Sequence, residues 1–188
     1  MKTVKSLFRC KYFLKMRGQK RTKTPIEFSD LLWSWIGSFI AVGAVSLVFF
    51  DIVVNQMDKM MLIGSFGASA VLLFAVTNSP LAQPRNVLGG FMISALIGVT
   101  AYKLFSHDIW LASAIAVSTS IAVMQLAQIL HPPGGATALI AVIGSDDIHS
   151  LGYSYVFLPV GMGACILLSV ALIINNIPKS RSYPQYWV

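Results

Sequence analysis

Two short stretches decide the fold of this chain: GASAVL at residues 67–72 and GATALI at residues 135–140. Each has a glycine, then small residues, then aliphatic ones, and each follows a glycine-containing break, GSF at 64–66 or PPG at 132–134. Short, glycine-interrupted apolar segments at corresponding places in two halves of a chain are typical of membrane transport proteins. The pair therefore predicts a duplicated membrane protein.

The composition agrees with a membrane location. Of the 188 residues, 56% are hydrophobic and 11% are charged, whereas a soluble domain carries about 25% charged residues. Nine of the 14 Lys and Arg residues fall within the first 24 positions, and no acid does. A soluble globular domain is excluded, and the net charge of +7 arises from the N-terminal segment.

Six apolar segments follow the basic start of the chain. They cover residues 31–50, 60–76, 87–104, 109–130, 134–144 and 155–177. A helix needs about 20 residues to cross the hydrocarbon core. The second segment is therefore marginal in length, and the fifth is too short to cross at normal depth.

The long segments that follow the two short ones also match each other. Both carry a small residue at every fourth position, which lets membrane helices approach closely; these residues are Gly90, Ser94 and Gly98 in one segment and Gly161, Cys165 and Ser169 in the other. The predicted fold is an all-α membrane protein. It has about six transmembrane segments in two inverted three-helix repeats, about 31–104 and 109–177, each with a short broken or re-entrant helix.

The charges predict how the chain is oriented. We divide it into a basic cytoplasmic arm (1–28), a transmembrane domain (29–177) and a short cytoplasmic tail (178–188). The arm is either a short interfacial helix or a disordered tail. With six crossings, twelve Lys and Arg lie inside and only Lys59 and Lys103 outside, so both termini are cytoplasmic by the positive-inside rule. Two re-entrant segments would give the same twelve-to-two count; we favour six crossings, in the inner (cytoplasmic) membrane of a bacterium.

The starts of the two short helices are the predicted binding site. A helix that begins within the membrane presents unpaired N–H groups and the positive end of its dipole, which together bind anions. Gly67, Gly134 and Gly135 would supply these backbone donors, and Ser69 and Thr137 would add hydroxyl groups. The alternative is that the glycines serve only close helix packing.

Three stretches resemble the HPP family of integral membrane proteins. They are HPPGGATAL at 131–139, GSFGASAVLLF at 64–74 and SPLAQPRNV at 79–87. The resemblance extends from about residue 30 to residue 177 and implies a small multi-span transporter. Relatives in plastids and cyanobacteria are linked to nitrite transport, and some relatives carry an added CBS regulatory domain, which is not expected here.

Three polar residues near the short segments are further candidates. Arg85 and His131 are the nearest ionisable groups and could attract an anion, and Gln128 could line its path. Each has a structural alternative: Arg85 as a topology anchor, His131 as the C-cap of the fourth segment, and Gln128 as a hydrogen-bond partner of a neighbouring helix. No acid falls inside any of the six segments, and Asp58 is expected outside the membrane.

The predicted function is that of a transporter or channel for a small inorganic anion, with nitrite as the first candidate. The alternative is a non-transporting membrane sensor or scaffold that recruits a partner through the basic arm. No set of nucleophile, base and metal ligands is visible, so an enzyme, a cofactor and a metal site are not expected. The expected partners are the anion and membrane lipid, with no nucleic acid; a homo-oligomer is left open.

Overall fold

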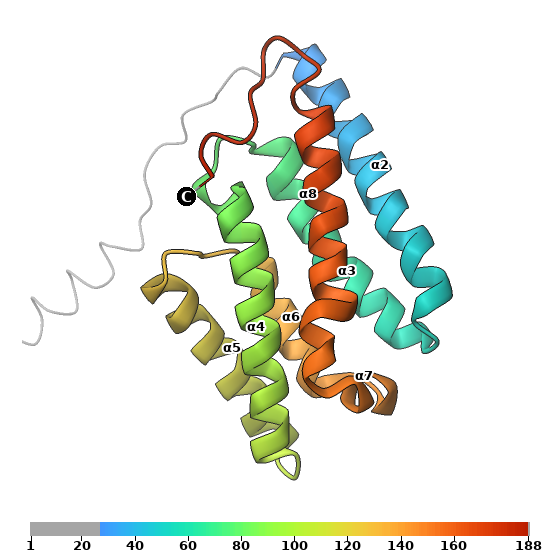
Figure 1. The fold of residues 1–188 in the computed structure, drawn as a ribbon, viewed down its shortest axis with the longest axis vertical. Coiled ribbons are helices and arrows are strands. Elements are labelled where there is room, and N and C mark those ends of the chain that lie inside the picture. The colour runs from blue at the N-terminus through green and yellow to red at the C-terminus, as the bar shows by residue number, and fades with distance from the viewer. Residues whose placement is uncertain (1–26, 188) are drawn as a thin grey trace, which may run out of the picture.

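The computed structural model describes residues 27–187 as a bundle of helices (Figure 1). Most of the predicted basic arm lies outside the described residues. The main helices are α2 (Phe28–Ile52), α3 (Gln56–Ala75), α4 (Pro84–Phe105), α5 (Ile109–Leu126), α6 (Pro133–Ile143), α7 (Asp146–Leu151) and α8 (Met162–Ile174). Short helical turns η2 (Pro80–Ala82), η3 (Gly152–Val156) and η4 (Phe157–Gly161) complete the chain.

The all-α membrane class is confirmed. None of residues 27–187 forms a strand. Within this part of the chain, five helical stretches are long and apolar enough to cross a membrane: α2, α3, α4, α5 and Asp146–Ile174, which runs from α7 through η3 and η4 to the end of α8. Helix α6 is a shorter apolar helix of 11 residues. The protein is thus a multi-pass membrane protein with five to six spanning helices.

The predicted break in the first short segment is wrong, because α3 runs unbroken through residues 64–66. It begins at Gln56, where the Asn55 side chain accepts hydrogen bonds from the amides of Met57 and Asp58. Its 20 residues reach about 30 Å, enough to cross the hydrocarbon core. A glycine inside a helix costs only about 1 kcal/mol relative to alanine, and tertiary packing outweighs that cost.

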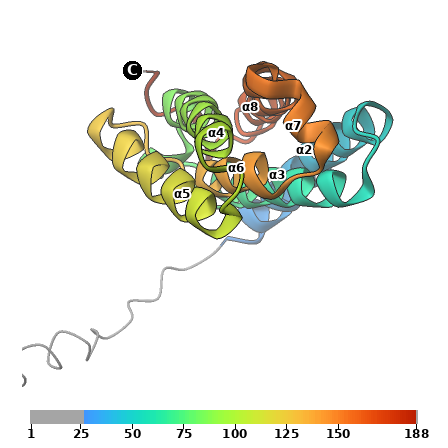
Figure 2. The same ribbon diagram turned by 90° about the horizontal axis from the view of Figure 1, so that it is seen from below.

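The second short segment behaves as predicted. Helix α6 begins at Pro133, the second proline of the pair, and has 11 residues, or about 16 Å at 1.5 Å per residue. It lies among α3, α4 and α5, all of which it contacts (Figure 2). The short helix is therefore at the centre of the bundle.

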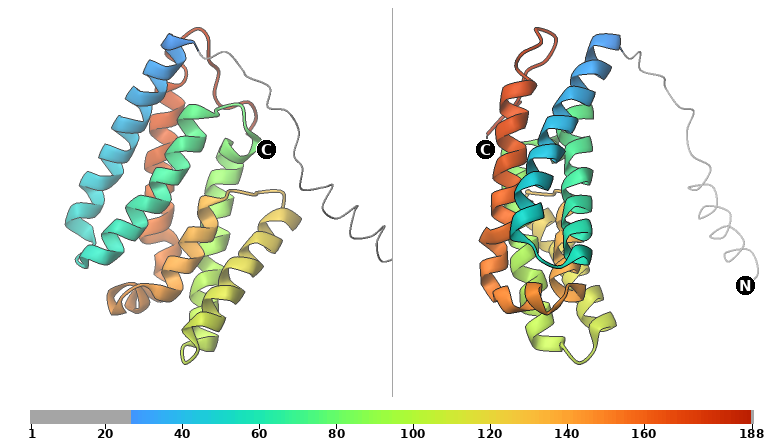
Figure 3. Two further views of the ribbon diagram at one scale, coloured as in Figure 1. Left: turned by 180° about the vertical axis from the view of Figure 1, so that it is seen from behind. Right: turned by 90° about the vertical axis from the view of Figure 1, so that its right-hand side faces the viewer.

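The helix contacts follow a regular scheme. Helices α2 and α3 lie side by side as an antiparallel pair (Figure 3), as α5 and α6 do; α4 packs on α5 and α6, α8 packs on α2 and α3, and α3 crosses α6. This set of contacts is unchanged when α2, α3 and α4 are exchanged for α5, α6 and α8. Two repeats would produce that relation, and the internal repeat itself stays a prediction.

Small residues let α6 press against α4. A Cβ atom on Gly98 would lie 2.5 Å from the carbonyl oxygen of Ala138, and one on Gly90 would lie 2.5 Å from the Cβ of His131. On the α6 side of this contact, a Cβ atom on Gly134 would lie 2.8 Å from the Gly90 carbonyl oxygen. The predicted stripe on α4 is thus a helix contact, whereas Cys165 of the second stripe is exposed.

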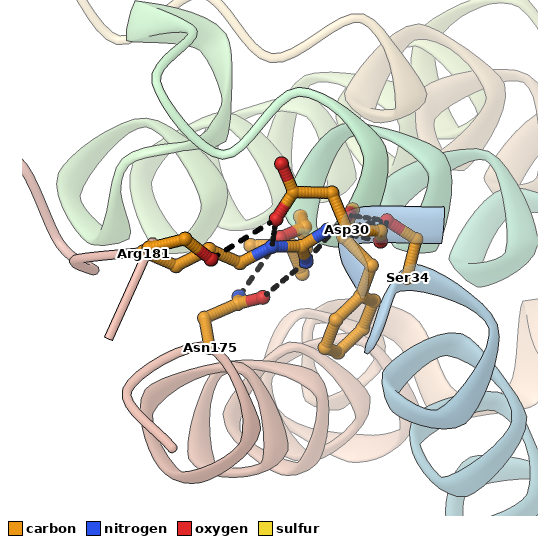
Figure 4. Close-up of polar contacts among 7 residues, drawn as sticks. Asp30, Ser34, Asn175 and Arg181 are labelled. Atoms are coloured by element: carbon orange, nitrogen blue, oxygen red, sulfur yellow. Dashed lines mark hydrogen bonds and ion pairs between the residues drawn. The ribbon is translucent and has the colours of Figure 1, made fainter. Parts of the chain in front are cut away.

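The C-terminal tail ties three segments together at one end of the bundle (Figure 4). The Arg181 guanidinium lies 3.1 Å from the Asp30 carboxylate, donates to the Phe74 carbonyl at 3.2 Å and donates to the Ser34 hydroxyl at 2.9 Å. Asn175 donates to the neighbouring Leu73 carbonyl at 3.0 Å. These bonds satisfy carbonyl groups at the end of α3 and place the start of α2 beside the tail at the same end of the bundle.

Substituting Gly98 should destabilise the bundle far more than substituting Gly67. Gly98→Ala forces α4 away from α6 and should lower the free energy of unfolding by about 1–3 kcal/mol. A Cβ on Gly67 meets nothing within 4 Å, so Gly67→Ala should be neutral or stabilise by up to about 1 kcal/mol. Thermal unfolding of both variants in detergent micelles checks this order, and equal unfolding temperatures would contradict it.

Arg181→Met should loosen the end of α3. The variant removes the charged donor from the Phe74 carbonyl of α3 and the Asp30 carbonyl of α2, which should cost about 2–3 kcal/mol. The ion pair adds little, because Asp30 is 39% exposed. Lys179→Met is the matched control, since Lys179 is exposed. The measurement is thermal unfolding in micelles, and a loss no greater than that of the control would show that the tail is not a stabilising contact.

Candidate functional site: a buried polar contact between α3 and α6

Helix α6 begins inside the bundle. Its residue Gly134 packs against Gly90 and Ser94 of α4, which lie about 9 and 15 Å along that helix from Pro84. The hydrocarbon core is about 30 Å thick. The start of α6 therefore lies at membrane depth, as predicted for the second short helix.

The backbone donors at this start are already used. The amide of Gly134 donates to the His131 carbonyl at 2.9 Å, and that of Gly135 donates to the Pro132 carbonyl at 3.0 Å. Gly67 lies in the interior of α3, where the amide bonds the preceding turn of the helix. An anion at these places would have to be bound by side chains, which corrects the expectation of two exposed helix starts.

Hydroxyl groups join α3 to α6. The Ser65 hydroxyl donates to the Pro133 carbonyl at 3.0 Å and lies 3.1 Å from the Thr137 hydroxyl. The Tyr155 hydroxyl, from η3, donates to the Thr137 carbonyl at 3.1 Å. All three side chains are buried, so the contact between the two helices is polar and dry.

His131 extends this contact toward the end of the bundle where the tail lies. Its Nδ1 is 2.8 Å from the Leu81 carbonyl oxygen, and its Nε2 is 2.8 Å from the Ser69 hydroxyl. A carbonyl can only accept, so Nδ1 carries the proton and a neutral ring accepts from Ser69 through Nε2. The ring is fully buried and packs on Phe91 at 4.9 Å between ring centroids.

His131 is not the C-cap of the fourth segment. Helix α5 ends at Leu126, with Ala127 as its C-cap, rather than at residue 130. Gln128 follows with a positive φ of 55°, a conformation uncommon for residues other than glycine that turns the chain away from the helix axis. The connection then returns into the bundle at His131.

The structure gathers some of the predicted site residues and leaves others apart. Ser69, His131, Gly134 and Thr137 lie at the buried contact, with Gly135 half-buried in the first turn of α6. The other three predicted residues, Arg85, Gln128 and Gly67, lie away from this contact. Arg85 is exposed, with its guanidinium 3.4 Å from the Ala127 carbonyl oxygen. Gln128, the residue after Ala127, is also exposed.

One buried acid was missed by the sequence analysis. Asp58 lies in the first turn of α3 and is fully buried, whereas the second apolar segment was predicted to begin only at residue 60. Its carboxylate accepts from the backbone amide of Ser145 at 3.0 Å and from the Ser145 hydroxyl. Asn55 was the available signal, since an N-cap residue there starts the helix before Asp58.

We group six buried polar side chains along α3 and its neighbours as the polar file: Asp58, Ser65, Ser69, His131, Thr137 and Tyr155. Its three α3 members recur at a spacing that places them on one face of the helix. They extend about 16 Å along α3, from Asp58 near one end of the bundle to Ser69 and His131 toward the other. All six side chains are buried.

Two hollows lie on the other side of α3. One of about 630 Å³ is lined by Asp30, Ser34 and Arg181, and one of about 500 Å³ continues between α2 and α3 as far as Gly67. Neither is lined by a member of the polar file. The polar file is therefore closed to both hollows. Its hydroxyl and imidazole groups bond one another or backbone carbonyls, and Asp58 bonds Ser145.

Ser69→Ala should leave the buried Nε2 of His131 without a donor. The expected cost is about 1–3 kcal/mol in the free energy of unfolding, measured by thermal unfolding against Ser169→Ala, whose hydroxyl is exposed and bonds only its own helix. Nitrogen NMR of the labelled imidazole gives an independent check. The wild-type ring should carry its proton on Nδ1, and a proton on Nε2 would contradict the assignment.

Comparisons with known proteins agree with a membrane role. The family described as the HPP transmembrane region matches residues 23–184. Two Dictyostelium discoideum proteins, both named only as transmembrane proteins, are 42% and 38% identical over 183 and 184 residues. These matches cover 94% and 96% of this chain but 63% and 58% of the relatives, so the chain spans about three-fifths of their length. No solved structure matches.

Proposed function

Because the chain belongs to the HPP family of transmembrane proteins, we propose that it transports a small inorganic anion, with nitrite as the first candidate. The anion crosses along the contact between α3 and α6. The observation that carries this proposal is the polar file, a row of buried polar side chains at membrane depth. Polar groups inside a membrane are costly to bury, and they commonly mark the path of a substrate or ion.

The chemistry of the polar file suits a small anion. Ser65, Ser69 and Thr137 supply hydroxyl donors, and Tyr155 adds a fourth. Hydrogen bonds from neutral donors hold a monovalent anion without the strong binding of a fixed cation, so the anion can leave again. Each donor now bonds another protein group, and a passing anion exchanges these bonds one after another.

The remaining predicted residues have supporting roles in this proposal. Arg85 and Gln128 are exposed at the connection that leads to His131, where they attract the anion before it enters. Gly134 and Gly135 permit the tight turn that starts α6 at membrane depth. Gly67 lies beside the hollow between α2 and α3, which leaves room for α3 to move away from α6.

The arrangement of helices supports a carrier with two related halves. Helices α3 and α6 cross at the centre, and each is flanked by corresponding neighbours. In transporters built from inverted repeats, the substrate site lies where the repeats meet, and one half moves against the other. Separation of α3 from α6 on alternate sides would open the polar file first to one face and then to the other.

Orientation and cellular location are part of the proposal. The basic arm places both termini in the cytoplasm by the positive-inside rule. Location in the inner membrane of a bacterium stays a prediction, and the two relatives are proteins of a eukaryote. We also propose that the protein contacts membrane lipid and binds no nucleic acid. A homo-oligomer formed through the exposed stripe at Cys165 is a further proposal.

The Ser69–His131 pair does not favour an enzyme. A serine hydroxyl 2.8 Å from an imidazole resembles a nucleophile with its base. Ser69 is fully buried in the interior of a helix, and neither large hollow of the described chain reaches it. We therefore assign the pair to the transport path rather than to covalent catalysis.

Thr137→Val should slow transport sharply. The variant keeps the side-chain shape but removes one donor, and a hydrogen bond to a charged group contributes about 1.5–3 kcal/mol, or roughly ten- to a hundredfold in rate. Uptake of labelled nitrite into proteoliposomes measures this effect. Thr100→Val is the matched control, because the Thr100 hydroxyl bonds the Leu96 carbonyl on its own helix.

The wild-type protein tests the function itself. Proteoliposomes should take up nitrite faster than empty vesicles under an imposed concentration gradient. If nitrite, nitrate, formate and chloride all enter no faster than into empty vesicles, the transporter proposal is wrong. The sensor or scaffold that recruits a partner through the basic arm would then be the better account.

A further inference from the structure

Asp58 is an unexpected group on the path of an anion. It is fully buried, and an anion that travels the polar file from His131 toward the opposite membrane face reaches its carboxylate. Two like charges a few ångströms apart in a medium of low dielectric constant repel strongly. With Asp58 ionised, that end of the polar file is closed to anions by charge as well as by packing.

No described cation neutralises Asp58. Lys59 follows it in sequence, but the Lys59 ammonium lies over the Phe50 ring, 4.4 Å from its centroid. Among the side chains that the structure describes, which are those of residues 27–187 apart from residue 51, the one ion pair is that between Arg181 and Asp30 at the opposite end of the bundle. The partners of the Asp58 carboxylate are the neutral amide and hydroxyl of Ser145.

The other titratable groups near this end do not take the place of a cation. Asp146 and Asp147 of α7 are exposed acids, which add negative charge. His149 of α7 points elsewhere, with its Nε2 3.1 Å from the Val142 carbonyl oxygen and its ring stacked on Tyr102. Tyr155 donates its hydroxyl to the Thr137 carbonyl. Lys103 lies over the Tyr153 ring, 5.5 Å from its centroid. Since none of the basic side chains described for residues 27–187 pairs with Asp58, we consider a proton as its neutralising charge.

We propose that Asp58 carries the coupling proton, so that one proton crosses with each anion. This inference rests on the proposed anion transport. The proton converts the carboxylate to a neutral carboxylic acid, which removes the repulsion and weakens the acceptor that holds Ser145 to α3. The anion then passes, and the proton leaves on the other side, restoring the carboxylate and its bonds to Ser145.

The charge balance makes this mechanism distinct. One proton and one monovalent anion carry no net charge across the membrane. Uptake should therefore respond to a pH difference and not to a membrane potential. At equilibrium, a pH difference of one unit should accumulate the anion about tenfold on the alkaline side.

The experiment uses the full chain in proteoliposomes, with labelled nitrite and, separately, nitrate as probes. Empty vesicles measure the unassisted crossing of nitrous acid and are subtracted. Wild-type uptake should rise when the outside is acid, and a potassium diffusion potential should not change it. Asp58→Asn, a neutral residue of the same shape, should exchange labelled for unlabelled nitrite but no longer accumulate it with the pH difference.

Asp108→Asn is the matched control, because Asp108 is an exposed acid whose side chain makes no cap hydrogen bond. It should keep the response to pH. Asp58→Glu retains a carboxyl group and should also keep the response to pH. Thermal unfolding shows whether each variant is folded, and Asp58→Glu provides the test if Asp58→Asn does not fold.

Each remaining outcome decides the matter. Wild-type uptake that ignores the pH difference overturns the role of Asp58 and leaves anion transport standing. The role of Asp58 is also overturned if the Asp58→Asn protein still accumulates nitrite with the pH difference. It is overturned as well if this variant is folded but does not exchange labelled for unlabelled nitrite. No wild-type uptake of either probe removes the proposed transport and, with it, this inference.

Discussion

The close approach of α6 to α4 is the contact on which the rest of the structure depends. A helix of 11 residues cannot cross the hydrocarbon core by itself, and its starting turn would place polar backbone groups in lipid. Gly90, Gly98 and Gly134 let the two backbones meet without intervening side chains. Inside that contact, tight-turn hydrogen bonds satisfy the first amides of α6, so a helix can begin at membrane depth without exposed donors.

Once α6 is held in this way, its other face meets α3 through polar side chains. Ser65 bonds the Pro133 carbonyl, and His131 receives the Ser69 hydroxyl while donating to Leu81. Each of these bonds satisfies a group that burial would otherwise leave unpaired. A small polar solute can replace either partner in such a hydrogen bond, so these contacts can open and close again. Tight apolar packing offers no such exchange. Structural need and a transport path are therefore compatible in one set of residues.

The sequence predicts the start of α6 better than any other feature. Two prolines followed by two glycines at 132–135 interrupt a helix for covalent reasons that hold in any environment. The glycines near residue 64 carry only a small penalty, so packing against α2 and α6 keeps α3 intact and moves its start back to Gln56. Asp58 therefore falls inside α3 rather than before it. Pairs such as Ser65 with Thr137 depend on how α3 crosses α6, which no local pattern specifies. Arg181 likewise acts through distant partners in α2 and α3.

The bond between Arg181 and the Phe74 carbonyl joins residues 107 positions apart, and it has a consequence for the order of synthesis. A chain emerges from the ribosome from its N-terminus, so α2 and α3 enter the membrane long before Arg181 exists. The first helical hairpin is then the earliest part to be made and among the last to be completed. A chain whose synthesis stops before Arg181 has only the Ser34 hydroxyl as donor to the Phe74 carbonyl, so the end of α3 is completed only when the tail has been made.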